Sequence, residues 1–140
     1  MTAGEYLKRE LTQIACGTYQ GESDLTALVK EWKTPWGIEL CKRLKFPTAD
    51  FFAQYKDELL KHNVFQNQNG LQFYNRDIIL VNSSAIVEYN QPQQTYYVLL
   101  YSGSSVVIKA RNCAVVKVCC ITEDNMVDII KSDNSDVVVK

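Results

Sequence analysis

The feature that most constrains the fold is a strand pattern that recurs through the second half of the 140-residue chain. From Tyr96 onward, apolar residues alternate with other residues, and this alternation returns at steps of 10, 10, 11 and 10 residues. The successive sets are Tyr96/Val98/Leu100, Val106/Ile108/Ala110, Ala114/Val116/Val118, Val127/Ile129 and Val137/Val139. Alternation is typical of strands with one buried face, and a fixed step indicates one strand-and-turn unit used repeatedly.

Two architectures fit this repeat. In a β-solenoid each unit forms one side of a coil, whereas in an antiparallel meander or barrel each turn is a hairpin. The nearly constant step favours the solenoid, because stacked coils need a common register. The turns also lack the Asn-Gly and Asp-Gly pairs typical of tight hairpins. Lys109, Lys117 and Asp128 have the opposite parity to the apolar sets and predict the outer face.

The first half of the chain predicts short helices with recognisable caps. Thr2 and Glu5 form a capping box before a stripe of Leu7, Leu11, Ile14 and Ala15, with Gly17 at its end. Ser23, Thr34-Pro35 and Thr48 begin three further helices. The apolar period changes from helical to strand-like near residue 64. We therefore expect an α+β chain, with a helical lobe over residues 1–64 and a repeated-strand lobe over residues 65–140.

Composition and charge argue against several functional classes. The net charge is −1, and neither half of the chain has the positive excess that binding to a nucleic-acid backbone requires. The longest apolar runs, such as residues 96–101, are too short to span a bilayer, and the first residues do not resemble a secretion signal. The five cysteines show no repeated spacing, which favours reduced thiols in a cytoplasmic protein.

The residue pattern predicts no catalytic, cofactor-binding or metal-binding site. The single histidine, His62, is expected at the end of a helix, where a surface role favoured by the helix dipole explains it. Cys119 and Cys120 are adjacent and face opposite sides of a strand, so they do not readily bind one metal ion. The acidic residues between Asp124 and Asp136 follow no calcium-loop pattern and fit solvated turns.

Tyrosines and valines supply the candidate interface residues. Tyr89, Tyr97 and Tyr101 lie on the parity away from the apolar sets or at turn edges, where exposed rings would suit an interface. The alternative is that these rings are buried between the two lobes. Val137, Val138 and Val139 are apolar on both faces of the last strand, and an exposed strand of this kind needs a partner. They predict a homo-oligomer.

The order of these features resembles that of a protein group known from phages. Short helices lead to Lys45-Phe46-Pro47 and Phe51-Phe52, then to Asn75-Arg76-Asp77-Ile78, and then to the repeated strands. Over roughly residues 25–140 this order is similar to small uncharacterised proteins encoded in phage and prophage-like regions of gut bacteria. The resemblance implies a phage or mobile-element origin and helices followed by a solenoid. It implies no activity and no functional residue.

These observations favour a non-enzymatic interaction or structural accessory protein that acts through surface contacts. An alternative is an anti-defence factor that inhibits a host protein or sequesters a small-molecule signal in the host cytoplasm. An enzyme with a site not visible in the sequence is the third class, because catalytic sites occur on any fold.

Overall fold

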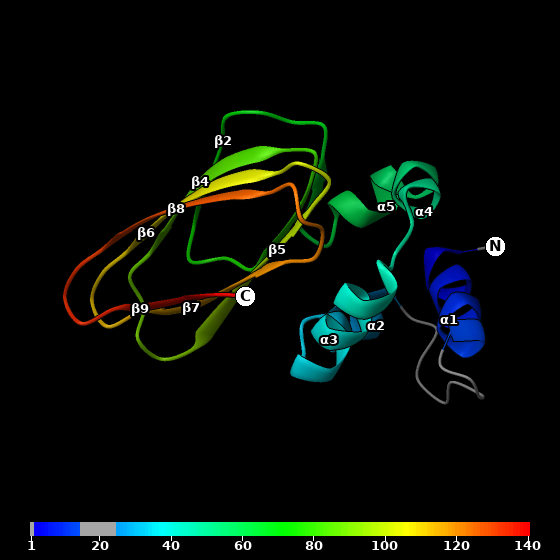
Figure 1. The fold of residues 1–140 in the computed structure, drawn as a ribbon, viewed down its shortest axis with the longest axis horizontal. Helices are drawn as coiled ribbons and strands as arrows, with labels where there is room; N and C mark the ends of the chain where they lie inside the picture. The colour runs from blue at the N-terminus through cyan, green and yellow to red at the C-terminus, as the bar shows by residue number, and fades with distance from the viewer. Residues whose placement is uncertain (1, 15–24) are drawn as a thin grey trace. The chain divides into compact units, whose positions relative to one another are not determined.

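The computed structural model describes residues 2–14 and 25–140 and divides into two compact units, Met1–His62 and Asn63–Lys140 (Figure 1). Every helix among the described residues belongs to the first unit, and every strand belongs to the second. The observed class is therefore α+β, with helices preceding strands along the chain. None of the described helices is long and apolar enough to cross a membrane.

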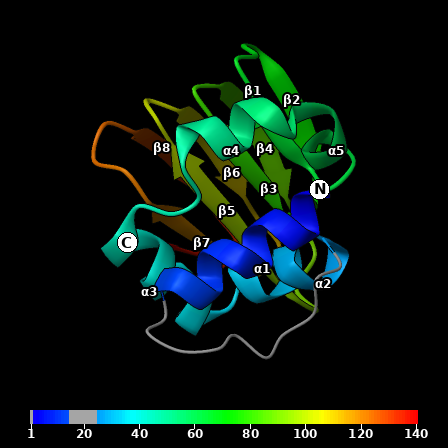
Figure 2. The ribbon, with the colours of Figure 1, turned by 90° about the vertical axis from the view of Figure 1, so that its right-hand side faces the viewer.

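The described residues of the helical unit form five short helices. They are α1 (Ala3–Ile14), α2 (Leu25–Trp32), α3 (Pro35–Leu44), α4 (Ala49–Gln54) and α5 (Lys56–Leu60). Within this unit α2 packs against both α1 and α3 (Figure 2). The helix expected from Thr48 onward is interrupted at Tyr55, which ends α4 and precedes α5 with a non-helical φ of −111° and ψ of 26°.

The predicted capping residues are present at the N-termini of these helices. Glu5 N–H donates to Thr2 Oγ1 at 3.1 Å, and Thr2 N–H donates to Glu5 Oε2 at 3.2 Å, so the capping box is reciprocal. Thr34 Oγ1 accepts from Gly37 N–H at 3.1 Å at the start of α3. Thr48 caps α4 in the same way. The expected cap Ser23, with Ala15 and Gly17, lies outside the described residues.

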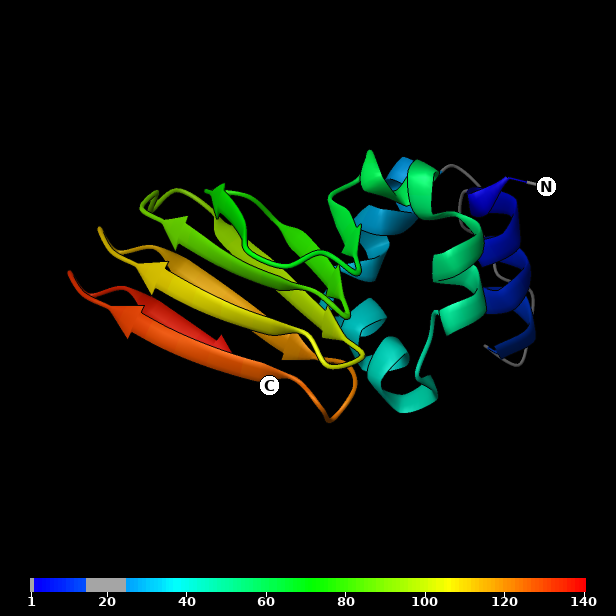
Figure 3. The same ribbon diagram turned by 90° about the horizontal axis from the view of Figure 1, so that it is seen from above.

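The second unit is a β-solenoid. Its strands are β1 (Val64–Gln66), β2 (Leu71–Tyr74), β3 (Ile78–Val81), β4 (Ser84–Tyr89), β5 (Thr95–Tyr101), β6 (Ser105–Ala110), β7 (Val115–Cys120), β8 (Met126–Lys131) and β9 (Asp136–Val139). Odd-numbered strands form a five-stranded sheet and even-numbered strands form a four-stranded sheet (Figure 3). Neighbours in each sheet are parallel, for example β5 with β7 and β6 with β8. The solenoid prediction is confirmed, and the antiparallel meander or barrel is wrong.

The coils become longer after the first one. Val64 pairs with Ile79, whereas Ile78 pairs with Val98, which in turn pairs with Val118. Two strand-and-turn units of about ten residues each therefore make one full coil, as the recurring step predicts. The first coil is shorter because its strands are shorter: β1 has three residues and β2 has four, whereas β5 has seven and β6 has six. For this reason β1 and β2 were not part of the pattern that begins at Tyr96.

The alternating sets face the interior of the solenoid. The strand side chains of the core include Tyr96, Val98, Leu100, Val106, Ile108, Ala110, Val116 and Val118, all buried. Lys109 and Asp128 are exposed, as the parity predicts. Lys117 and Val127 are both half-buried. Cys120 packs against the core as its parity predicts, whereas Cys119, on the opposite parity, is also buried.

Polar side chains tie the turns of successive coils together. At one corner Gln68 N–H donates to Ser83 Oγ at 3.1 Å, and Ser83 N–H donates to Ser104 Oγ at 3.2 Å. Ser104 N–H then donates to Asn125 Oδ1 at 2.8 Å. At another corner Asn75 Nδ2 donates to Asn90 Oδ1 at 2.8 Å. The three contacts at the first corner satisfy turn backbone groups that the sheets do not pair, and the fourth joins two side chains.

Candidate interaction surfaces

The last coil ends in two open strand edges. Among the described residues β8 has β6 as its single sheet neighbour, and β9 has β7. We call these two strands, β8 and β9, the last-coil edge. Met126 is 69% exposed and Ile130 is 60% exposed, while Ile129 and Val139 are 40% and 43% exposed. Large apolar side chains and unpaired strand groups therefore coincide on this coil.

The free backbone groups of β9 can be identified from its bonds to β7. Asp136 N–H donates to Ala114 O at 2.9 Å, and Lys140 N–H donates to Val118 O at 2.8 Å. Successive residues of a strand direct their N–H and C=O groups to opposite sides. Val137 and Val139 therefore direct theirs away from β7, toward the open side of the sheet.

Of the two alternatives that the sequence left open for Tyr89, an exposed ring or a buried one, the exposed ring is wrong. Tyr89 is fully buried in the solenoid core, its ring centroid lies 4.8 Å from that of Tyr96, and its hydroxyl donates to Arg76 O at 2.8 Å. Burial, and then the neighbouring Asp77 and Tyr96, raise the pKa of the Tyr89 hydroxyl. The parity count from Tyr96 did not apply, because Tyr89 belongs to β4 of the other sheet.

The other candidate residues lie on the five-stranded sheet. Tyr101 is buried at 2% exposure, and Tyr97 is half-buried beside Lys117 in the register of β5 and β7. Val137 and Val138 are half-buried, and Val139 is exposed. The three valines thus lie together on β9, apart from the buried Tyr89 and Tyr101. Their role in an interface stays a prediction.

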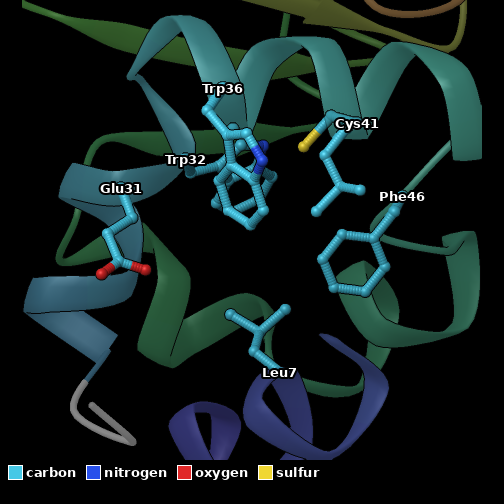
Figure 4. A pocket seen from close by; sticks show the side chains of 8 residues that line it. Leu7, Glu31, Trp32, Trp36, Cys41 and Phe46 are labelled. Atoms are coloured by element: carbon cyan, nitrogen blue, oxygen red, sulfur yellow. The ribbon is translucent and has the colours of Figure 1, made fainter. Parts of the chain in front are cut away.

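A second candidate surface is an apolar pocket in the helical unit, which we call the helical pocket (Figure 4). It is lined by Leu7, Glu31, Trp32, Trp36, Gly37, Leu40, Cys41 and Phe46. Leu7 comes from α1 and Trp36 from α3, and the two side chains approach a common space from opposite sides (Figure 4). Trp36 is 57% exposed, so the pocket presents an accessible aromatic wall.

Local geometry fixes the two tryptophans of the pocket. A Cβ atom at Gly37 would collide with the carbonyl oxygen of Glu31, so only glycine allows α3 to begin this close to α2. Thr34 Oγ1 donates to that same carbonyl at 2.6 Å. The tight connection brings Trp36 to the pocket in which Trp32 is buried.

The helical pocket is small. Its cavity volume is about 30 Å³, whereas small-molecule sites commonly enclose about 300 Å³ or more. A space of this size suits one water-sized group or the tip of an apolar side chain. Its geometry therefore fits a protruding side chain better than a nucleotide-sized signal.

The reactive residue types remain dispersed in the described part of the chain. His62 is half-buried just after α5, and Cys41 is a buried residue of α3. The Thr122 hydroxyl donates to Asp124 Oδ1 at 2.7 Å and lowers the pKa of that carboxyl, which fits an ordinary turn acid. The described residues contain no group of three or more His, Cys, Asp or Glu that could hold a metal ion.

Sequence reasoning missed Met126, Ile130 and Trp36. The first two have the outward parity of Asp128, so two apolar residues flank a charge on the predicted outer face. That departure from the pattern of Lys109 and Lys117 was a usable signal. Trp36 is four residues after Trp32, a spacing that puts two residues on one face of a continuous helix. The two residues lie on different helices, however, so the spacing does not show where Trp36 points.

Comparisons with protein-family models, with curated proteins and with solved structures found no match to this chain.

Proposed function

We propose that this protein is a non-enzymatic interaction protein that assembles with other copies of itself through the last-coil edge. The observation that carries the proposal is the coincidence, on β8 and β9, of exposed apolar side chains and unpaired strand groups. Strand edges recruit further strands by main-chain hydrogen bonds, and the side chains beside them determine which strand fits. A phage or mobile-element origin and a cytoplasmic location belong to the same proposal.

The exposed side chains of β8 strengthen this proposal. Met126 and Ile130 are both more than half exposed on the outer parity of one strand. Burying them against another chain would contribute about 25 cal/mol for each Å² of apolar surface removed from water. The adjacent positions of the middle coils differ, since Lys109 pairs with Ile130 in the register of β6 and β8. The outer face of this sheet is therefore charged on β6 beside Ile130, and its other exposed apolar side chains, Tyr74 and Ile86, lie on β2 and β4.

Sedimentation analysis of three proteins tests the proposal. The wild-type chain should associate at micromolar concentration, and Ile130→Lys should be monomeric, because a charge replaces an apolar contact. Ile86→Lys is the matched control, since Ile86 is exposed on the outer parity of β4, away from the last coil. A monomeric wild-type chain, or equal effects of the two substitutions, would contradict the proposal.

The helical pocket favours a second candidate function, an anti-defence factor that binds a host protein. An accessible Trp36 beside a cavity of about 30 Å³ suits the insertion of one apolar side chain from a partner. Aromatic residues around small pockets are common energetic centres of protein interfaces. The small volume favours a protein partner over sequestration of a small-molecule signal.

This candidate is tested by comparing Trp36→Ala with Leu60→Ala in affinity purification from host cells. Leu60 is 45% exposed in the same unit and does not line the pocket. A specific host protein should be retained by the wild-type chain and by Leu60→Ala, and lost by Trp36→Ala. Equal retention by all three proteins would exclude the helical pocket as the binding surface.

A further inference from the structure

We infer that two copies of this chain join through antiparallel pairing of β9 with β9, about a two-fold axis that passes through Val138. This inference rests on the proposed self-association and specifies its geometry. Three independent observations lead to it: the direction of the free backbone groups, the charges on the outer face of β9, and the position of the facing strand β8.

The free backbone groups suit this register. Val137 and Val139 direct their N–H and C=O groups to the open side, because Asp136 and Lys140 bond to β7. With Val138 on the axis, Val137 of one copy lies opposite Val139 of the other. In an antiparallel ladder two such residues exchange both of their hydrogen bonds. Every free group of Val137 and Val139 then has a partner.

The side-chain charges distinguish this register from its neighbours. Asp136, Val138 and Lys140 have the same parity on β9, and Asp136 and Lys140 are both exposed. When Val138 faces itself, Asp136 of each copy lies opposite Lys140 of the other. Opposite charges directly across an antiparallel pair stabilise it, and like charges destabilise it. A shift of the β9–β9 register by two residues loses both Asp136–Lys140 pairs. A shift by one residue moves the side chains of one copy to the opposite face of the sheet.

The facing strand agrees with the same axis. Lys131 ends β8 and Asp136 begins β9 across one turn, so Ile129 and Val138 both lie two residues from that turn. Met126 N–H donates to Ser104 O and Ser132 N–H donates to Ala110 O, which leaves the groups of Ile129 on the open side. One axis through Val138 and Ile129 therefore pairs β8 with β8 while β9 pairs with β9. Such closed two-fold pairing is self-complementary.

A charge-exchange experiment tests the register. Asp136→Lys places lysine opposite Lys140, so the dimer dissociation constant should rise at least about tenfold, because both symmetric pairs become repulsive. Lys140→Asp should weaken the dimer similarly. The double variant Asp136→Lys/Lys140→Asp exchanges the two charges and should restore the wild-type dissociation constant, measured by sedimentation equilibrium.

Cysteine trapping tests the axis directly. A residue on a two-fold axis faces itself, and facing Cα atoms at such a non-hydrogen-bonded position lie about 4.5 Å apart, within the range of a disulfide. In a Cys113→Ser background, which removes the exposed cysteine among the described residues, Val138→Cys should form a covalent dimer under mild oxidation. Lys117→Cys is the control, because Lys117 pairs with Val138 but lies one strand farther from the axis.

The outcomes separate this inference from the proposed function. Rescue by the double variant together with trapping of Val138→Cys alone would support the two-fold register. Self-association that Ile130→Lys abolishes, but that the charge exchange does not rescue, would overturn the register and leave the last-coil edge as the interface. A chain that remains monomeric in all experiments would overturn both.

Discussion

Two neighbouring coils of the solenoid carry the same sequence pattern but differ in burial. Ile108 in β6 and Ile129 in β8 are paired in register, yet Ile108 is fully buried and Ile129 is 40% exposed. Similarly, Val118 is fully buried and its partner Val139 is 43% exposed. The strand pattern sets which way a side chain points, whereas the next coil determines whether water reaches it.

This difference separates stability from binding within one repeated structure. An inner coil is covered on both sides, so its apolar side chains contribute mainly to folding. The last coil is covered on one side, so the same side-chain types remain available to a partner. The following predictions test that division.

The largest expected effect is the loss of folding in Val116→Asp. Val116 is fully buried between Tyr96 and Val137, and an unpaired carboxylate there has no hydrogen-bonding partner. Lys117→Asp, at the next position, should cost less than about 1 kcal/mol, because this half-buried position faces outward. Thermal unfolding followed by circular dichroism measures both, and similar melting temperatures would show that the register is wrong.

The next largest effect is the difference between the same side-chain truncation in the two coils. Ile108→Ala should lower the free energy of unfolding by about 2–5 kcal/mol, the usual range for a cavity in a packed core. Ile129→Ala should cost less than half as much, because water already reaches its side chain. Urea titration of both variants as monomers gives the two values. Equal losses would mean that the last coil is as well packed as the coil before it.

A smaller effect is expected for Tyr89→Phe at neutral pH. The variant keeps the ring beside Tyr96 but loses the hydrogen bond to Arg76 O, at a cost of about 1 kcal/mol. The raised pKa of Tyr89 means that the folded chain holds this proton while the unfolded chain releases it near pH 10. Tyr89 thus stabilises the fold fully below pH 10 and less as the pH rises above it.

The measurement is urea unfolding of both proteins between pH 8 and about pH 11, where free tyrosines ionise. The wild-type chain should lose its advantage over Tyr89→Phe as the pH increases. A difference between the two proteins that stays constant over this range would contradict the assignment of Tyr89 as a buried, protonated core residue.

The smallest perturbation is thiol labelling. Cys113 is exposed in the turn before β7 and should react within the native protein, whereas the buried Cys41 and Cys119 should react slowly. All five cysteines should react once the chain is unfolded without reductant. Mass spectrometry of the labelled protein counts the thiols. A count of three on unfolding would indicate a disulfide and contradict the expected reducing compartment.

Much of the architecture could be predicted because it depends on local patterns. The caps at Thr34 and Thr48 need only the adjacent residues, and the recurring step from Tyr96 follows from the alternation within each strand. The first coil was harder to recognise, because its shorter strands break the step on which the repeat was identified. Tyr89 was misplaced because parity cannot be counted from Tyr96 across a turn of unknown length.

The candidate surfaces were only partly predictable. Val137 to Val139 were expected at an exposed strand because their sequence is apolar on both parities. Trp36 could not be assigned, because its exposure depends on how closely α3 begins after α2, which the collision at Gly37 sets.

The sequence by itself determined the strand-and-turn repeat, the face to which each repeat points its apolar side chains, and the starts of the capped helices. These follow from residue spacing and short-range hydrogen bonds. Tertiary structure alone decided that the strands pair in parallel with a neighbour two strands away, and that Tyr89 is core while Ile129 is exposed. The physical reason is that burial depends on chain segments about 20 residues apart, such as Val98 and Val118, which no local pattern specifies.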